Sequence, residues 1–134
     1  MTEPQNKEVE KPLLKVEGLK THFFVDEQVI RAVDEVDLEI SRGEIFGLVG
    51  ESGCGKTVTA LSIMGLIDDP GQIIAGEVIF DGTSLLPLSE EVLNQIRGGR
   101  ISLIFQDPHV RLNPVFTIGS QLAEIFQVHY GEPH

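Results

Sequence analysis

Eight consecutive residues have the types and the spacing of a phosphate-binding loop. Residues 50–57 read Gly-Glu-Ser-Gly-Cys-Gly-Lys-Thr, which is a complete G-x-x-x-x-G-K-[ST] motif. The glycines let successive backbone N–H groups converge on an oxyanion, and a helix that starts at the loop adds the positive end of its dipole. Lys56 can reach the β- and γ-phosphates as a point charge, and the Thr57 hydroxyl can ligate Mg²⁺. The segment therefore predicts a site for a nucleoside triphosphate with magnesium.

A strand before this motif and a helix after it must hold the loop in place. Residues 45–49 are the apolar run Ile-Phe-Gly-Leu-Val, which predicts a short buried strand that enters the loop. Residues 57–64 predict the helix that leaves it, with an end near Gly65. The alternative is a glycine-rich turn without a ligand. Such a turn would explain the glycines, but it does not need Lys followed by Thr.

The region before the loop predicts a small antiparallel sheet. Residues 14–19 and 36–40 alternate apolar and polar side chains, so each predicts a strand with one buried face. Residues 21–25 and 29–33 predict two further strands, joined by a turn at residues 26–28. The pattern therefore predicts four short strands between residues 14 and 40.

The region after the loop predicts two helices and two strands. Residues 76–80 predict a strand, and a short helix is expected from Ser89 to about Arg97. Residues 101–105 (Ile-Ser-Leu-Ile-Phe) predict a second buried strand. Residues 117–130 predict an amphipathic helix, and the side chains expected on one side of it are Ile118, Leu122, Ile125, Phe126 and His129.

Composition limits the class of protein. At 134 residues and 41% hydrophobic, the chain has the size of one small domain with enough apolar material for a core. Its net charge of −11 argues against nucleic acid as the main partner. It has no run of 18 apolar residues, and residues 1–8 are too polar for a secretory signal, so we expect the cytoplasm. Residues 1–12 predict a disordered tail, which leaves 13–134 as the domain.

Four segments besides the phosphate loop carry a recognisable pattern. They are residues 13–23 (Leu-Leu-Lys-Val-Glu-Gly-Leu-Lys-Thr-His-Phe), 32–36 (Ala-Val-Asp-Glu-Val), 60–66 (Ala-Leu-Ser-Ile-Met-Gly-Leu) and 104–114, where Ile-Phe-Gln-Asp-Pro is followed by Leu-Asn-Pro. Together they resemble the ATP-binding subunits of ABC transporters, in particular those of the oligopeptide, dipeptide and nickel importer group. The resemblance covers about residues 13–130. It implies an α/β P-loop NTPase core of the ABC ATPase type, with a partial parallel sheet and an N-terminal antiparallel β subdomain.

The resemblance also implies residue roles. Phe23 matches the aromatic residue that stacks on the adenine base, and the alternative is an ordinary strand residue. Gln106 matches the loop glutamine that ligates Mg²⁺ or positions the attacking water, and residues 107–116 resemble the surface where a membrane subunit docks. The expected catalytic residues are Lys56 and Gln106, and the expected metal ligands are Thr57 and Gln106. The expected nucleotide contacts are Phe23, Gly50, Glu51, Ser52, Gly53, Cys54, Gly55, Lys56, Thr57 and Val58.

By the same resemblance, the cofactors are ATP and Mg²⁺, and the partners are ABC permease membrane subunits and a second ATPase subunit. The protein would then lie on the cytoplasmic face of the cell membrane. The sequence lacks a Leu-Ser-Gly-Gly-Gln-like signature, a strand ending in Asp-Glu (the Walker B motif) and a switch histidine, so we expect the N-terminal part of such a domain. Whether this chain alone hydrolyses ATP stays open. Two alternatives also stay open: a stand-alone nucleotide-binding or interaction protein from a truncated gene, without hydrolysis, and an unrelated P-loop kinase or GTPase.

Overall fold

A computed structural model describes residues 11–107 and 112–131. Most of the predicted N-terminal tail, residues 1–10, lies outside the described residues. The chain divides into two compact units, Met1–Leu88 and Ser89–His134, and each is described by itself.

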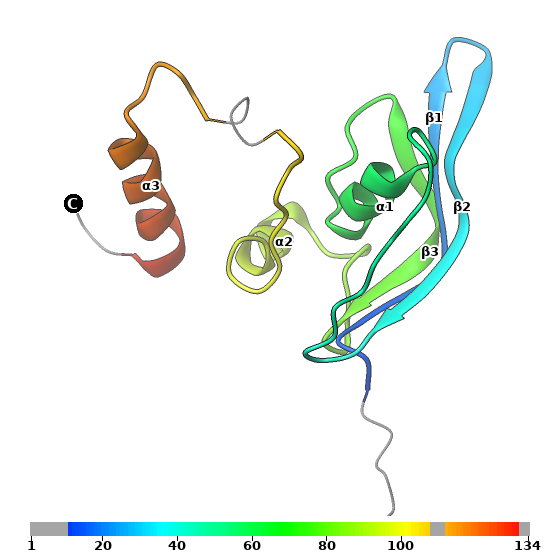
Figure 1. The fold of residues 1–134 in the computed structure, drawn as a ribbon, viewed down its shortest axis with the longest axis horizontal. Coiled ribbons are helices and arrows are strands. Elements are labelled where there is room, and N and C mark those ends of the chain that lie inside the picture. Colours follow the sequence, from blue (N-terminus) through cyan, green and yellow to red (C-terminus); the bar gives the residue numbers. More distant parts are fainter. Residues whose placement is uncertain (1–10, 108–111, 132–134) are drawn as a thin grey trace, which may run out of the picture. The chain divides into compact units, whose positions relative to one another are not determined.

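The first unit is built on a four-stranded antiparallel sheet (Figure 1). Its strands are β1 (Leu14–Val25), β2 (Gln28–Ile40), β3 (Gly71–Phe80) and β4 (Thr83–Ser84), in the order β2-β1-β3-β4. β1 pairs with β2 on one side and with β3 on the other, so it is an inner strand of the sheet. The predicted antiparallel sheet is therefore confirmed.

Two long strands replace the four short ones predicted between residues 14 and 40. The ladder between β1 and β2 contains register shifts, which the strands tolerate without separating. At one of them Thr21 pairs with Val33 and His22 pairs with Arg31, so Ala32 is the extra residue of a β-bulge in β2. The breaks in the alternating pattern are therefore bulges within continuous strands.

Helix α1 (Lys56–Ile63) packs on this sheet (Figure 1). It confirms the helix predicted after the phosphate loop. Thr21 Oγ1 of β1 lies 2.7 Å from Ser62 Oγ of the helix, and both residues are buried. Ser62 Oγ also donates to the Val58 carbonyl oxygen at 2.7 Å, and a hydroxyl has one proton, so the Thr21 hydroxyl is the donor between the two side chains. The apolar core around this contact consists of Leu14, Val16, Leu19, Val33, Met64, Val78, Phe80 and Leu85.

Two predicted buried strands are not formed. Residues 45–49 contain no strand, and Ile45 and Val49 are 99% and 90% exposed. Residues 101–105 take part in a single isolated bridge between Arg97 and Ile101, and Ile104 is 88% exposed. A strand needs a neighbouring backbone to bond with, and in the described part of the chain no strand pairs with either segment. The prediction that these segments are buried strands is wrong, and the sheet observed in residues 11–107 and 112–131 is antiparallel.

The second unit contains helices α2 (Glu90–Ile96) and α3 (Ile118–Tyr130), as predicted. Ser89 occupies the N-cap of α2, and Thr117 caps α3 with its hydroxyl, which accepts from the Ser120 N–H at 3.2 Å. α2 buries Leu93 and Ile96, whereas the apolar side of α3 is exposed. None of the described helices is both long and apolar enough to cross a membrane.

Candidate nucleotide-binding site

The phosphate loop opens directly onto the N-terminus of α1. Residues 50–54 are exposed, Gly55 is the N-cap, and Lys56 is the first helical residue. Gly55 has no side chain that could accept from the first N–H groups of the helix. Those donors and the helix dipole therefore face the solvent at the loop, where an anion can bind them.

The Lys56 ammonium lies across the loop. Its Nζ donates to the carbonyl oxygens of Gly50 at 2.7 Å and Glu51 at 2.6 Å, and it lies 3.4 Å from Cys54 Sγ. An ammonium has three protons to donate. Lys56 thus holds the two sides of the loop together while keeping its positive charge at the opening.

The loop is also held from behind, by β2. Gly55 has φ +92°, and a Cβ built on it would overlap the carbonyl oxygen of Ala32, the bulge residue of β2. Both the backbone angle and the close approach therefore require glycine there. The Gly55 carbonyl accepts from the Thr59 N–H at 2.8 Å and from Thr59 Oγ1 at 3.0 Å, which fixes the loop to the first turn of α1.

Phe23 lies on the face of the sheet that α1 covers. Thr21 contacts Ser62 of that helix, and alternate residues of a strand point to the same face, so Phe23 points the same way. The ring is half-buried. It is therefore a strand residue with part of its surface still accessible, which leaves both sequence interpretations of Phe23 open.

The other expected site residues differ in their exposure and in the unit to which they belong. Glu51, Ser52, Gly53, Cys54 and Thr57 are exposed, and Val58 is half-buried. Gln106 is exposed and belongs to the second unit, whereas Lys56 and Thr57 belong to the first. The predicted docking surface at 107–116 includes residues 108–111, which lie outside the described residues.

Three residues next to the expected site were not among the expected site residues. Ala32 supports Gly55, and Gly71 lies against both the Phe23 ring and Ile67. The pairing of β1 with β3 brings Gly71 to Phe23, whereas Gly55 and Ile67 belong to no strand and reach their partners only in the folded chain.

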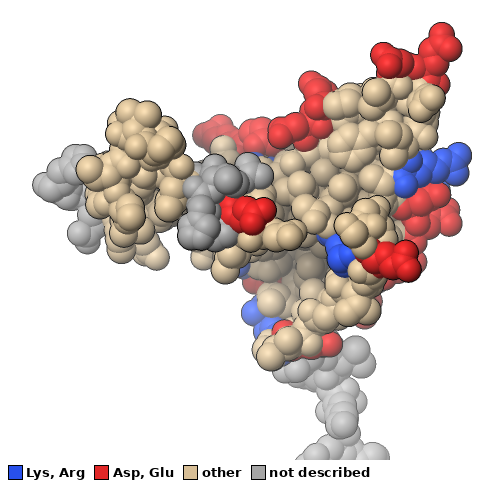
Figure 2. Space-filling model, turned by 45° about the horizontal axis from the view of Figure 1, so that its top comes forward, with Lys and Arg blue, Asp and Glu red and all other residues tan. Residues whose placement is uncertain are grey.

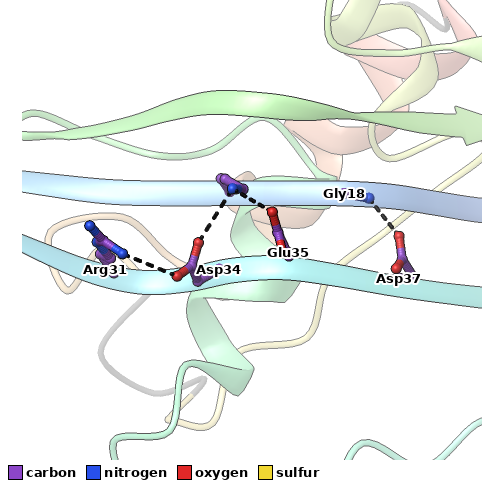
Figure 3. A network of polar contacts seen from close by, with 6 residues as sticks. Gly18, Arg31, Asp34, Glu35 and Asp37 are labelled. Carbon is purple, nitrogen blue, oxygen red and sulfur yellow. Dashed lines mark hydrogen bonds and ion pairs between the residues drawn. The ribbon is translucent and has the colours of Figure 1, made fainter.

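Charged residues of the sheet form a separate polar network along β1 and β2 (Figure 3). Lys20 Nζ donates to Glu35 Oε1 at 2.8 Å and lies 3.8 Å from Asp34 Oδ1, and Arg31 lies 3.7 Å from the other Asp34 oxygen. The hydrogen bond with Glu35 raises the pKa of Lys20, although partial burial opposes it. Asp37 Oδ1 accepts from the Gly18 N–H at 2.6 Å. These contacts tie β2 to β1.

The face shown in Figure 2 carries many acidic side chains and few Lys or Arg. This distribution agrees with the net charge of −11. Because such a surface repels a phosphate backbone, it offers no basic track for nucleic acid on the face shown.

Sequence comparisons identify relatives of this chain. The profile of the ABC transporter family matches residues 33–130. The "Probable peptide ABC transporter ATP-binding protein y4tR" of Sinorhizobium fredii is 51% identical over 118 residues, which are 87% of this chain and 35% of that protein. The dipeptide transport ATP-binding protein DppD of Escherichia coli is 44% identical over 119 residues, 89% of this chain and 36% of DppD. The chain thus spans about a third of the length of the curated relatives it matches.

Solved structures show the same fold. The dimeric structure of MJ0796, described as a bacterial ABC transporter cassette, has a TM-score of 0.78 at 26% identity, and the match covers 90% of this chain and 50% of that one. A second structure of the ATP-binding cassette MJ0796, in a post-hydrolysis state bound to ADP and Pi, has a TM-score of 0.74 at 24% identity. The expected α/β fold of the ABC ATPase type is therefore confirmed.

Proposed function

Because this chain belongs to the ABC transporter family, we propose that it binds ATP with Mg²⁺ within the ATPase subunit of an importer for peptides or similar solutes. The names of its relatives, which are peptide and dipeptide transport ATP-binding proteins, support this solute class. Family membership excludes an unrelated P-loop kinase or GTPase. No finding favours the stand-alone binding protein.

The geometry of the phosphate loop is the observation that carries this proposal. The Lys56 charge, the uncapped N–H groups of α1 and the backbone of residues 50–55 meet at one exposed place. All three favour an anion there, and a lysine that already spans the loop pays little further ordering entropy when the phosphates arrive. The loop is thus suited to the β- and γ-phosphates of a nucleotide.

Other residues would complete the nucleotide site. Thr57 follows Lys56 on the first turn of α1, where its hydroxyl can ligate Mg²⁺ beside the phosphates. Gln106 would act as a second magnesium ligand or would position the attacking water, and Phe23 would stack on the base. Bound magnesium would offset the negative charge that the phosphates develop during transfer.

We also propose partners for the complete subunit. Two ATPase subunits would bind two ATP molecules between them and drive a membrane permease from its cytoplasmic face. The solved neighbour with the same fold is described as dimeric, which supports a second ATPase subunit.

A titration of the chain with a fluorescent ATP analogue tests the proposal. Lys56→Ala removes the loop's own cation, and hydrogen bonds to charged groups contribute about 1.5–3 kcal/mol, so affinity should fall by about ten- to a hundred-fold. Lys15→Ala is the matched control, because Lys15 lies on β1 and is paired with Glu17 at 2.9 Å. Equal affinities of the Lys56 variant and the parent chain would refute the phosphate-loop assignment.

Cys54 offers a second test within the same loop. Its thiol is exposed and lies 3.4 Å from Lys56 Nζ, so it should react with a maleimide when the loop is empty. Bound Mg-ATP should cover the thiol and slow the labelling, and Mg²⁺ alone should not. Labelling at the same rate with and without Mg-ATP, read by mass spectrometry, would place the nucleotide elsewhere.

A further inference from the structure

We propose that Gly71 and Ile67 position the Phe23 ring as a platform for the nucleobase, and thereby set the preference of the site for ATP over bare triphosphate. This inference rests on the proposed function, because it assigns a nucleobase to the accessible part of the ring. Neither residue belongs to the phosphate loop.

The ring lies directly over Gly71. Phe23 and Gly71 are paired residues of β1 and β3. A Cβ built on Gly71 would come within 2.7 Å of the Phe23 Cε1 atom and 3.0 Å of its Cζ atom. The edge of the ring therefore occupies the space that any side chain at position 71 would need.

Ile67 closes the same space from the side of the helix. Its Cγ2 atom would lie 2.7 Å from the same built Cβ, so Phe23 and Ile67 both pack against Gly71. Ile67 follows the end of α1 closely, and the turn before it is fixed by hydrogen bonds from the Gly65 N–H to Ser62 and from the Leu66 N–H to Leu61. Since α1 begins at the phosphate loop, this contact links the ring to the element that carries Lys56.

The backbone at Gly71 does not itself require glycine. Its φ lies outside the left-handed region, and its N–H donates to the Asp68 carbonyl at 2.9 Å, a bond that alanine would keep. A methyl group at position 71 would thus act through the ring and Ile67. It would tilt or displace the ring, and a base stacked on the ring would lose contact area.

The experiment compares equilibrium affinities of the full chain for Mg-ATP and for inorganic Mg-tripolyphosphate. Base stacking contributes about 1–3 kcal/mol, so Phe23→Ala should weaken ATP binding by about ten-fold or more and leave tripolyphosphate binding unchanged. Gly71→Ala and Ile67→Ala should weaken ATP binding by about three- to ten-fold, again with tripolyphosphate unchanged. Gly119→Ala is the matched control, because a Cβ there meets nothing closer than 4.0 Å.

A double variant separates positioning from a merely structural role. If Gly71 acts through the ring, Gly71→Ala should have no further effect on ATP affinity in a chain that already carries Phe23→Ala. Equal losses for both ligands, or an added loss in the double variant, would overturn the inference. If Phe23→Ala leaves ATP binding unchanged, the proposed base contact fails and the inference fails with it. If Phe23→Ala weakens ATP binding selectively while Gly71→Ala and Ile67→Ala do not, only the inference fails.

Discussion

Strand β1 and residues 45–49 both have apolar side chains suited to β-structure, but these side chains are buried in β1 and exposed in residues 45–49. Val16 and Leu19 of β1 are 1% and 0% exposed, whereas Ile45 and Val49 are 99% and 90% exposed. β1 has a hydrogen-bonded neighbour on each side and a helix over one face. Residues 45–49 have no strand partner in the described ranges. An apolar segment is therefore buried only where other elements pack against it, and its composition alone does not bury it.

The phosphate loop keeps its shape although it follows the unpaired segment. Its contacts run forward to α1 and back to the bulge of β2, through Lys56, Gly55 and Ala32. The loop is therefore held by α1 and β2. Residues 45–49 should contribute little to its shape or to the stability of the fold.

The largest expected effect separates an alanine substitution in β1 from one in residues 45–49. Leu19→Ala removes a fully buried side chain and should lower the free energy of unfolding by about 2–5 kcal/mol. Ile45→Ala should change it by less than about 0.5 kcal/mol, because Ile45 is exposed. Urea unfolding followed by circular dichroism measures both. Similar losses in the two variants would show that residues 45–49 are packed in solution.

A smaller effect is expected at the junction of the loop with β2. Gly55→Ala forces a non-glycine residue into a left-handed conformation, which costs about 1–3 kcal/mol, and its methyl group would also overlap the Ala32 carbonyl. Both stability and triphosphate affinity should fall. Gly47→Ala, in the unpaired segment, should leave both unchanged, since a Cβ there meets nothing within 4 Å. If the Gly47 variant also lost affinity, the segment before the loop would be shaping it.

The buried contact between β1 and α1 should contribute about 1–2 kcal/mol. Ser62→Ala leaves the Thr21 hydroxyl buried without this acceptor, so the free energy of unfolding should fall by that amount. Adding Thr21→Val should recover part of the loss, because it removes the buried hydroxyl that has lost its acceptor. A further loss in the double variant would argue against this pairing.

The smallest effect is expected from the polar network of Figure 3. Glu35→Gln removes the hydrogen bond that raises the pKa of Lys20, so stability should fall slightly. The folded-state pKa lies above the ordinary value of 10.5, so the contribution is present below that pH and is lost as the pH rises through the raised pKa. Thermal unfolding at neutral pH and above pH 10.5 measures it, with Glu27→Gln at the β1–β2 turn as the control. If the difference in melting temperature between the Glu35→Gln and Glu27→Gln variants grew above pH 10.5, the stabilising role of the Lys20–Glu35 hydrogen bond would be contradicted.

Features that depend on residues close together in the chain could be predicted from the sequence. The phosphate motif of residues 50–57 predicted the loop and its helix, and the pattern before residue 40 predicted an antiparallel sheet. Helix α3 was predicted because its apolar spacing is local, and the cap at Thr117 is local as well. Such signals survive in a single sequence, since the atoms that interact are a few residues apart.

Two further features depend on contacts between distant parts of the chain: which apolar segments form strands, and which residues support the site. Residues 45–49 and 101–105 have sequences typical of strands, but they do not form strands. The hydrogen bonds of a strand go to another segment, and the sequence of the strand does not show which segment that is. The contacts of Gly55 with Ala32 and of Phe23 with Gly71 join residues from separate elements. The register of β1 with β3 pairs Phe23 with Gly71, and that register exists only once the sheet has formed. Gly55 meets Ala32 only where the phosphate loop packs against β2.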